Sequence, residues 1–445
     1  MRKKKIGDIL KEVLKDVKPE DKEIKEIENY VKEFLKKFNS QAKKLKINAE
    51  GFVGGSFAKG TVIKKDHYDI DIFVRFDKKY RDDEISNLTE KILKTFRKDF
   101  DRIHGSRDYF KVEGTKVPFT KSSFKLGGKS DNPINFYIEI IPVIKIKNPK
   151  EARNITDLSY SHVRYLNKKT NKKLLDEIRL VKAFCYANKC YGAESYINGF
   201  SGYSLELLTH YYGGFMNLLK AIAKTKDKIF IDIEKNYRNK NVISMDLNSS
   251  KLQSPIVLID PTFKQRNAAA ALSQEAFDKL KKASKKFIKN PSRKAFVKEE
   301  FDIEKIKSNA KKNKLDFVLL KIETDRQEGD IAGSKLLKFY RHLKEEVKNY
   351  FVIKTNVFEY DNKKQGEGIF VGKNKKELII EGPPLIKKEN VEGFKKAHKN
   401  VFVKKDKLYA KEKINFNLKE FFVKWKKKNI GKMKAMSIVS FEILD

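Results

Sequence analysis

A nine-residue segment with two acidic side chains most strongly limits how this chain can fold. In the segment 68–76, apolar residues alternate with polar ones, and this period of two indicates a β-strand. Alternate side chains of a strand share one face, so Asp69 and Asp71 project together, about 7 Å apart along the backbone. Ile70 and Ile72 then point into a core on the other face.

The turn before this strand has the composition of a phosphate-binding loop. Residues 54–61 read Gly-Gly-Ser-Phe-Ala-Lys-Gly-Thr, which puts small residues where a backbone can approach phosphate closely. Ser56, Lys59 and Thr61 add a hydroxyl, a cation and a second hydroxyl. Taken alone, the glycine turn could be only a tight connection. The acid pair alone could be a strand face in contact with solvent. Their order and spacing favour a single site for phosphate and metal.

A second apolar segment supplies a third acidic candidate. Glu139 stands among apolar neighbours in the segment 136–142, where an unpaired charge is costly unless a cation balances it. Carboxylate oxygens suit Mg²⁺, which also takes oxygens from substrate phosphates. A carboxylate that faces water on an edge strand is the alternative interpretation of Glu139.

Gly-Ser followed at short range by Asp-x-Asp resembles the active-site signature of the polymerase-β-type nucleotidyltransferases. The resemblance implies in-line phosphoryl transfer with two Mg²⁺ ions. One ion lowers the pKa of the attacking 3′-hydroxyl, and the other holds the triphosphate and the leaving pyrophosphate. It also implies a third carboxylate, for which Glu139 is the candidate. The family typically has Asp at that position, so the longer Glu139 is a departure.

Segments farther along the chain narrow the resemblance. The segments 182–194 and 199–208, with Asp260-Pro261 and Arg266-Asn267, resemble class I, archaeal-type CCA-adding tRNA nucleotidyltransferases over roughly residues 50 to 290. This resemblance implies template-independent addition of C, C and A to the 3′ end of tRNA from CTP and ATP, with release of pyrophosphate. The implied roles are nucleotide contacts for Ser56 and Lys59, catalysis and metal binding for Asp69, Asp71 and Glu139, triphosphate binding for His162, Lys182 and Tyr191, and reading of the incoming base for Arg266.

Each of these later residues also has an ordinary structural interpretation. Lys182 could be a helix-surface lysine, Tyr191 a packing aromatic, His162 a loop histidine and Arg266 an ion-paired arginine. Only the resemblance favours their functional roles.

The charge balance indicates a polyanionic partner. The chain has 99 Lys and Arg against 60 Asp and Glu, a formal net charge of +39, and nucleic acid is the first candidate. A proteome that prefers surface lysine is the alternative. The resemblance implies that the acceptor stem and T-arm of tRNA are held by shape and phosphate contacts. Lysine clusters in 286–298, 404–407 and 424–428 are candidates for that grip.

The length of 445 residues exceeds one ordinary core, so we expect an α+β multidomain protein. The predicted parts are a polymerase-β-like nucleotidyltransferase palm at 1–150, a helical middle domain at 151–290, and a C-terminal α/β RNA-binding domain at 300–445. A charged stretch, 290–313, reads as a linker.

Two cysteines are too few for a disulfide framework, and the chain has no run of eighteen apolar residues. We therefore expect reduced thiols and a cytoplasmic enzyme with no membrane partner. The sequence leaves a homodimer open.

Two other functions compete with this hypothesis. A poly(A) polymerase or an oligoadenylate-synthetase-like enzyme shares the Gly-Ser and Asp-x-Asp chemistry. A non-catalytic basic RNA-binding protein on a decayed transferase fold is a second alternative, against which the intact acid pair and Lys182 argue.

Overall fold

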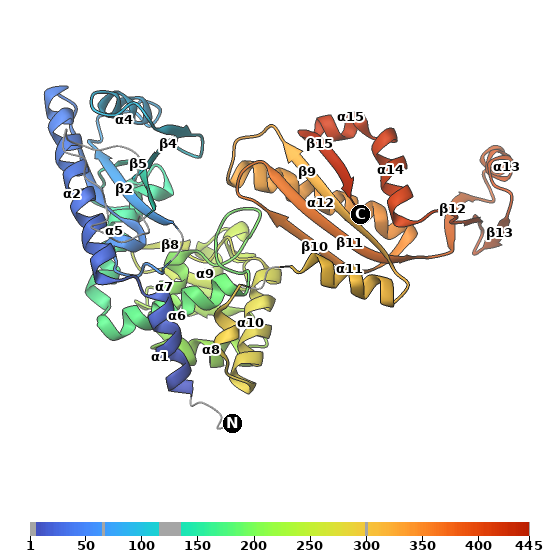
Figure 1. Ribbon diagram of the computed structural model, residues 1–445, viewed down its shortest axis with the longest axis horizontal. Coiled ribbons are helices and arrows are strands. Elements are labelled where there is room, and N and C mark those ends of the chain that lie inside the picture. Colours follow the sequence, from blue (N-terminus) through green and yellow to red (C-terminus); the bar gives the residue numbers. More distant parts are fainter. Residues whose placement is uncertain (1–5, 65–66, 115–134, 299–300, 445) are drawn as a thin grey trace. The chain divides into compact units, whose positions relative to one another are not determined.

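The computed structural model describes residues 6–64, 67–114, 135–298 and 301–444 (Figure 1). The chain forms two compact units, 1–299 and 300–445, which are described separately. Their boundary falls in the predicted linker, although this stretch also forms η4 (Arg293–Phe296) and α11 (Ile303–Lys312). Among the described residues, no helix is long and apolar enough to cross a membrane.

A five-stranded sheet forms one part of the first unit. Its order is β1-β2-β5-β4-β3, in which β2 and β5 run parallel and the other neighbouring pairs run antiparallel. The predicted strand 68–76 is confirmed as β2. The strands are β1 (Ala49–Val53), β2 (Tyr68–Phe76), β3 (Asp101–Ile103), β4 (Tyr109–Glu113) and β5 (Phe136–Ile144).

Helices cover one face of this sheet and leave the acids on the other. Phe34 and Phe38 of α2 (Asp21–Lys44) share a buried core with Ile70 and Ile72 of β2, because the apolar side chains of β2 alternate with its polar ones. Figure 1 shows α2 alongside the sheet. Helix α4 spans Ile85–Lys94. It ends where the Thr95 hydroxyl donates to the Ile92 carbonyl at 2.6 Å, a local bond that competes with helix continuation.

The middle of the chain is mainly helical, as predicted. Its core also receives Ile9 and Val13 of α1 (Ile6–Val17). A small sheet of β6, β7 and β8 was not predicted, because the short apolar run 256–259 cannot be assigned to helix or strand by periodicity. The main elements are α5 (Ser159–Lys169), α6 (Lys172–Ala187), α7 (Gly202–Tyr212), α8 (Phe215–Lys224), β6 (Ile229–Ile231), α9 (Lys240–Asp246), β7 (Ile256–Asp260), β8 (Phe263–Asn267) and α10 (Gln274–Lys289). Cys185 and Cys190 are buried, free thiols.

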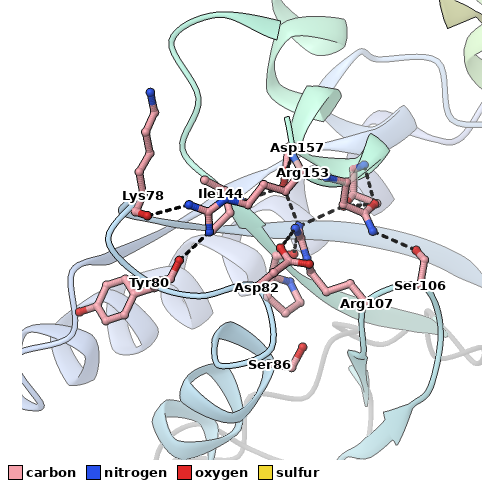
Figure 2. A network of polar contacts seen from close by, with 12 residues as sticks. Lys78, Tyr80, Asp82, Ser86, Ser106, Arg107, Ile144, Arg153 and Asp157 are labelled. Atoms are coloured by element: carbon pink, nitrogen blue, oxygen red, sulfur yellow. Dashed lines mark hydrogen bonds and ion pairs between the residues drawn. The ribbon is translucent and has the colours of Figure 1, made fainter. Parts of the chain in front are cut away.

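A buried aspartate fixes the start of α5 to the end of β5. Asp157 has 2% exposure and accepts hydrogen bonds from the Arg107 guanidinium at 2.6 Å and the Ile144 amide at 2.8 Å. Arg107 also pairs with Asp82, and Arg153 donates to backbone carbonyls of the β2–α4 connection (Figure 2). This network positions the helix that carries His162.

The C-terminal unit is α/β, as predicted. A four-stranded sheet, β10-β11-β9-β15, packs with α12 and α14 around a core that includes Phe421, Phe422 and Trp425. These three aromatics are therefore core residues. The elements of this part are β9 (Asp316–Thr324), α12 (Asp330–Tyr350), β10 (Phe351–Tyr360), β11 (Gln365–Asn374), α14 (Leu418–Lys428), α15 (Ile430–Ala435) and β15 (Ile438–Leu444). A separate, smaller group consists of β12 (Glu377–Pro384), α13 (Lys388–Ala397), β13 (Val401–Lys404) and β14 (Lys407–Lys413).

Candidate active site

The register of two parallel strands brings the predicted carboxylates to one face of the sheet. Asp71 of β2 lies opposite Glu139 of β5, and Asp69 lies opposite Tyr137. Partner residues on neighbouring strands point to the same face and are about 4.8 Å apart. Asp69 is exposed, whereas Asp71 and Glu139 are partly buried.

The environment of the two inner carboxylates opposes their ionisation. Burial raises the pKa of Asp71 to about 6, and the neighbouring Asp69 contributes in the same direction against Lys59 and Lys182. Burial, with Asp71 and Asp69 nearby, raises the pKa of Glu139 to about 7, although Lys111 acts against it. A bound cation would favour the charged form of both carboxylates.

The oxygen ligands that these carboxylates offer, and their neighbouring positions in the strand register, suit a hard cation. Among the described residues, no three acidic, histidine or cysteine side chains already converge as a metal-binding group. Asp69 and Asp71 share a strand face and Glu139 adjoins them. Mg²⁺ commonly uses only one or two carboxylates and completes its shell with water and substrate phosphate.

The glycine turn lies directly against Asp71. The Gly54 amide donates to the Asp71 carbonyl at 2.8 Å, and α3 (Gly55–Ala58) follows at once. Gly55 has φ +57°, and a Cβ there would lie 1.6 Å from Asp71 Oδ2. Only glycine allows this backbone conformation and this close approach. Ser56 is held next to the acids, and its carbonyl accepts from the Thr61 amide at 2.9 Å.

A cavity of about 330 Å³ opens beside the turn. Six of the predicted site residues line it: Ser56, Lys59, Asp69, Asp71, Lys182 and Tyr191. Burial raises the pKa of the Tyr191 phenol, which is therefore a protonated donor at neutral pH. The structure thus brings together residues that are more than 120 positions apart in the sequence.

A buried glutamate joins the two predicted phosphate-binding lysines. Glu206 of α7 accepts from Lys59 Nζ at 2.6 Å and from Lys182 Nζ at 2.7 Å, and Thr61 donates to it at 2.6 Å. Burial alone would raise the pKa of Glu206, but the ammonium groups of Lys182 and Lys59 outweigh it and hold that pKa at about 2. Sequence reasoning missed this residue. The available signal was a single acid among the leucines of 205–208, the same kind of signal that pointed to Glu139.

The remaining predicted residues, His162 and Arg266, gather around a second buried carboxylate. Asp260 Oδ2 accepts from His162 Nε2 at 2.9 Å and from Arg266 Nη1 at 2.7 Å. Tyr203, which lines the cavity, donates to Asp260 Oδ1 at 3.1 Å and stacks on His162 with ring centroids 4.0 Å apart. Burial lowers the pKa of His162, against the opposing effect of Asp260, so the imidazole is neutral at pH 7. Neither Asp260 nor Tyr203 had been assigned a role.

The chain is similar in sequence to known nucleotidyltransferases. Residues 176–297 match the family model described as tRNA nucleotidyltransferase, second domain. Residues 5–119 match the one described as Second Messenger Oligonucleotide or Dinucleotide Synthetase domain. The CCA-adding enzyme of Nanoarchaeum equitans is 34% identical over 358 residues, which cover 80% of this chain and 81% of that protein. The chain belongs to the CCA-adding enzyme family.

Further relatives agree with this membership. The CCA-adding enzyme of Methanocaldococcus jannaschii is 32% identical over 413 residues, 91% of this chain and 87% of that protein. The predicted fold class is confirmed, because the chain combines a polymerase-β-like nucleotidyltransferase sheet with the second domain of the tRNA nucleotidyltransferases. A solved structure of the Cid1 poly(U) polymerase has a TM-score of 0.48 at 15% identity and covers 66% of this chain and 98% of its own.

One residue at the site departs from what the family resemblance implied. Glu139 stands where we expected an aspartate by resemblance, and the register still places it opposite Asp71. Glu206 adds a carboxylate on the lysine side of the cavity. The cavity of this family member therefore presents acids on two sides, with Lys59 and Lys182 held against one of them.

Proposed function

We propose that this chain adds C, C and A to the 3′ end of tRNA from CTP and ATP and releases pyrophosphate, without a template. The observation that carries the proposal is the parallel register that sets Asp71 opposite Glu139, directly beside the Gly55–Ser56 turn. Relatives called CCA-adding enzymes, which align with most of the chain, support the choice of reaction and substrates.

Asp69, Asp71 and Glu139 are the proposed ligands of two Mg²⁺ ions. When bound, such ions supply a lowered pKa for the attacking 3′-hydroxyl and charge stabilisation for the leaving pyrophosphate. The strands hold the three carboxylates on one sheet face, and their side chains would turn toward one another to share the ions, because among the described residues they do not yet converge. The raised pKa values of Asp71 and Glu139 support this role, because a charge cluster of this kind favours cation binding.

The cavity residues are the proposed nucleotide site. Lys59 and Lys182 offer cations to the triphosphate, while Ser56 and Tyr191 offer hydroxyl donors. Glu206 holds both ammonium groups in place, which pre-organises them for phosphate.

Arg266 is the proposed reader of the incoming base, with His162 beside it. Asp260 fixes one end of the guanidinium, while the buried Arg266 Nε has no hydrogen-bond partner among the described residues. A buried donor without a partner is costly, so the Arg266 guanidinium is suited to donate a hydrogen bond to an atom of a ligand. A planar set of donors can serve the acceptor edge of cytosine, and its fit to adenine depends on the shape of the pocket around it.

We assign the other roles by domain, with a palm at 1–150, a nucleotide- and tRNA-binding middle part at 151–290 and a tRNA-binding part at 300–445. The acceptor stem and T-arm are the proposed RNA contacts. The cytoplasm is the proposed location, consistent with the two free thiols. These assignments rest on the family resemblance and on the basic charge of the chain.

An incorporation assay tests the proposal. A tRNA transcript that lacks its 3′-terminal CCA should gain three residues ending in A when incubated with the protein, CTP, ATP and Mg²⁺. A ladder of adenylates would instead support a poly(A) polymerase. Asp71→Asn should abolish incorporation and leave the Kd for tRNA unchanged within about twofold, because the change removes a metal ligand and not a phosphate contact. Full activity of Asp71→Asn would refute the metal-binding assignment.

A further inference from the structure

A strongly basic pocket lies on the same sheet face as the carboxylates, toward the other end of β2. It encloses about 720 Å³, and no aspartate or glutamate is among the described residues that line it. Asp71 and Arg75 are four residues apart on β2 and share one face, so they are separated by about 13 Å along the strand. The residues that define this basic pocket are Arg75, Lys145, Lys147, Tyr160, Arg164 and Lys168.

In the part of the chain that the structure describes, no carboxylate neutralises the five cationic side chains of the pocket. Across the described residues, none of them forms an ion pair or a hydrogen bond with a carboxylate. Glu50 lies opposite Arg75 in the β1–β2 register but forms no ion pair with it among the described contacts. Like charges gathered in one concave site repel one another and attract a polyanion.

The Arg75 side chain packs against two aromatic rings. The Arg75 guanidinium lies 4.0 Å from the centroid of the Tyr160 ring and 5.7 Å from that of Phe52. The Tyr160 and Phe52 rings pack edge to face, with centroids 5.2 Å apart. Tyr160 is itself only partly buried. Arg75 is therefore oriented by stacking and keeps its hydrogen-bond donors for a ligand.

Helix α5 separates this pocket from the proposed nucleotide site. Tyr160, Arg164 and Lys168 are spaced four residues apart and share one face of the helix, and all three line the basic pocket. His162 projects from the opposite face and contacts Asp260. The pocket is thus a second anion site and not an extension of the triphosphate cavity.

We infer that the basic pocket binds backbone phosphates of the RNA strand whose 3′ end lies at the carboxylates. This inference rests on the proposed function and adds a location for the strand in the N-terminal unit. The strand must pass along the sheet face that carries Asp71 to present its 3′-hydroxyl there. Because the pocket lies about 13 Å from Asp71 along that face, it would contact phosphates a short way upstream of the 3′ end of the strand.

Two variants on different walls of the pocket test the inference. The first is Arg164→Gln with Lys168→Gln on α5, and the second is Lys145→Gln with Lys147→Gln after β5; all four side chains are exposed. The matched control is Lys32→Gln with Lys36→Gln, an exposed pair with the same spacing on α2, which covers the opposite face of the sheet.

The probe is the same tRNA transcript without its 3′-terminal CCA, bound at a series of salt concentrations. Each pocket variant should raise the Kd about tenfold at low salt. It should also make the slope of log Kd against log salt shallower by roughly 1.5, as expected for two lost phosphate contacts. KM for CTP, and kcat at saturating tRNA, should stay unchanged. The control should match the unmodified chain in every measurement.

Three outcomes would overturn the inference. These are an unchanged salt slope in both pocket variants, an equal loss in the α2 control, or a rise in KM for CTP with tRNA binding intact. The last result would assign the pocket to free nucleotide phosphates. If the unmodified chain adds no CCA, the proposed function fails; if it adds CCA and the pocket variants behave like the control, only this inference fails.

Discussion

Replacing Glu206 with glutamine should show how much one buried carboxylate stabilises the lysine side of the cavity. The Glu206 side chain is fully buried and accepts from Lys59 at 2.6 Å and Lys182 at 2.7 Å. Its pKa of about 2, against an ordinary 4.5, corresponds to about 3 kcal/mol of stability. Removing one partner of a buried ion pair costs a similar amount, about 3–5 kcal/mol. We therefore expect Glu206→Gln to lower the free energy of unfolding by about 3 kcal/mol at pH 7.

The same pKa fixes how this loss depends on pH. Because the folded-state pKa of Glu206 lies below the unfolded-state value, its contribution is complete above about pH 4.5 and disappears as the pH falls toward 2. Glutamine does not titrate. The difference in stability between the unmodified chain and Glu206→Gln should therefore be constant near neutral pH and should shrink between pH 4.5 and 2.

Urea unfolding distinguishes a loss of stability near Glu206 from a loss of stability throughout the chain. Trp425 is the single tryptophan and is buried in the C-terminal unit, so its fluorescence follows that unit alone, while far-UV circular dichroism follows both. Glu206→Gln should shift the circular dichroism transition and leave the Trp425 transition unchanged. Glu177→Gln is the matched control, because among the described residues Glu177 accepts only the Phe215 amide, at 2.8 Å; it should cost about 0.5 kcal/mol. A loss below 1 kcal/mol for Glu206→Gln, or one that is constant down to pH 2, would refute the reasoning.

Three further predictions follow from single contacts. Gly55→Ala would place a Cβ 1.6 Å from Asp71 Oδ2 and should lower kcat about 100-fold with tRNA binding intact, whereas Gly393→Ala, which meets no atom within 4 Å, should leave kcat unchanged. Arg266→Lys keeps the charge but not the planar fork and should raise KM for CTP about tenfold, measured at saturating tRNA; an unchanged KM would contradict base reading. Asp157→Asn removes the negative charge that pairs with Arg107 in Figure 2 and replaces one of the two acceptor oxygens with a donor, and it should lower unfolding stability by about 3 kcal/mol, as measured by urea unfolding; a loss under 1 kcal/mol would contradict this account.

Local pattern was enough to predict the strand that carries the acids. The alternation in 68–76 predicted the bounds of β2 and the shared face of Asp69 and Asp71. The family resemblance implied a third carboxylate, and the cost of desolvating an unpaired charge among apolar neighbours then singled out Glu139. That β5 lies directly beside β2 in parallel, with Asp71 and Glu139 in register, depends on strand pairing between distant segments, which periodicity does not encode.

Contacts between distant segments account for most of what the sequence did not reveal. Glu206 binds a lysine 147 residues away, and no local pattern predicts such a partner. Asp260 was visible only as part of a resembling motif, although it holds His162 and Arg266 together. The sheet of β6, β7 and β8 was missed because its strands are short and β7 is entirely buried, which removes the alternation used to recognise strands.

The charge distribution on the sheet face ties the proposed chemistry to the proposed RNA path. The cavity is lined by two ammonium groups, Lys59 and Lys182, and by four carboxylates, Asp69, Asp71, Glu194 and Glu206, a formal balance of +2 − 4 = −2. A triphosphate would be repelled by that balance, so we expect divalent cations to enter with it, as in the proposed function. The basic pocket at the other end of β2 has cations and no acid among its described lining residues. One sheet face thus offers an anionic end that needs metal and a cationic end that needs phosphate. A growing RNA strand with its metal-bound nucleotide satisfies both ends at once.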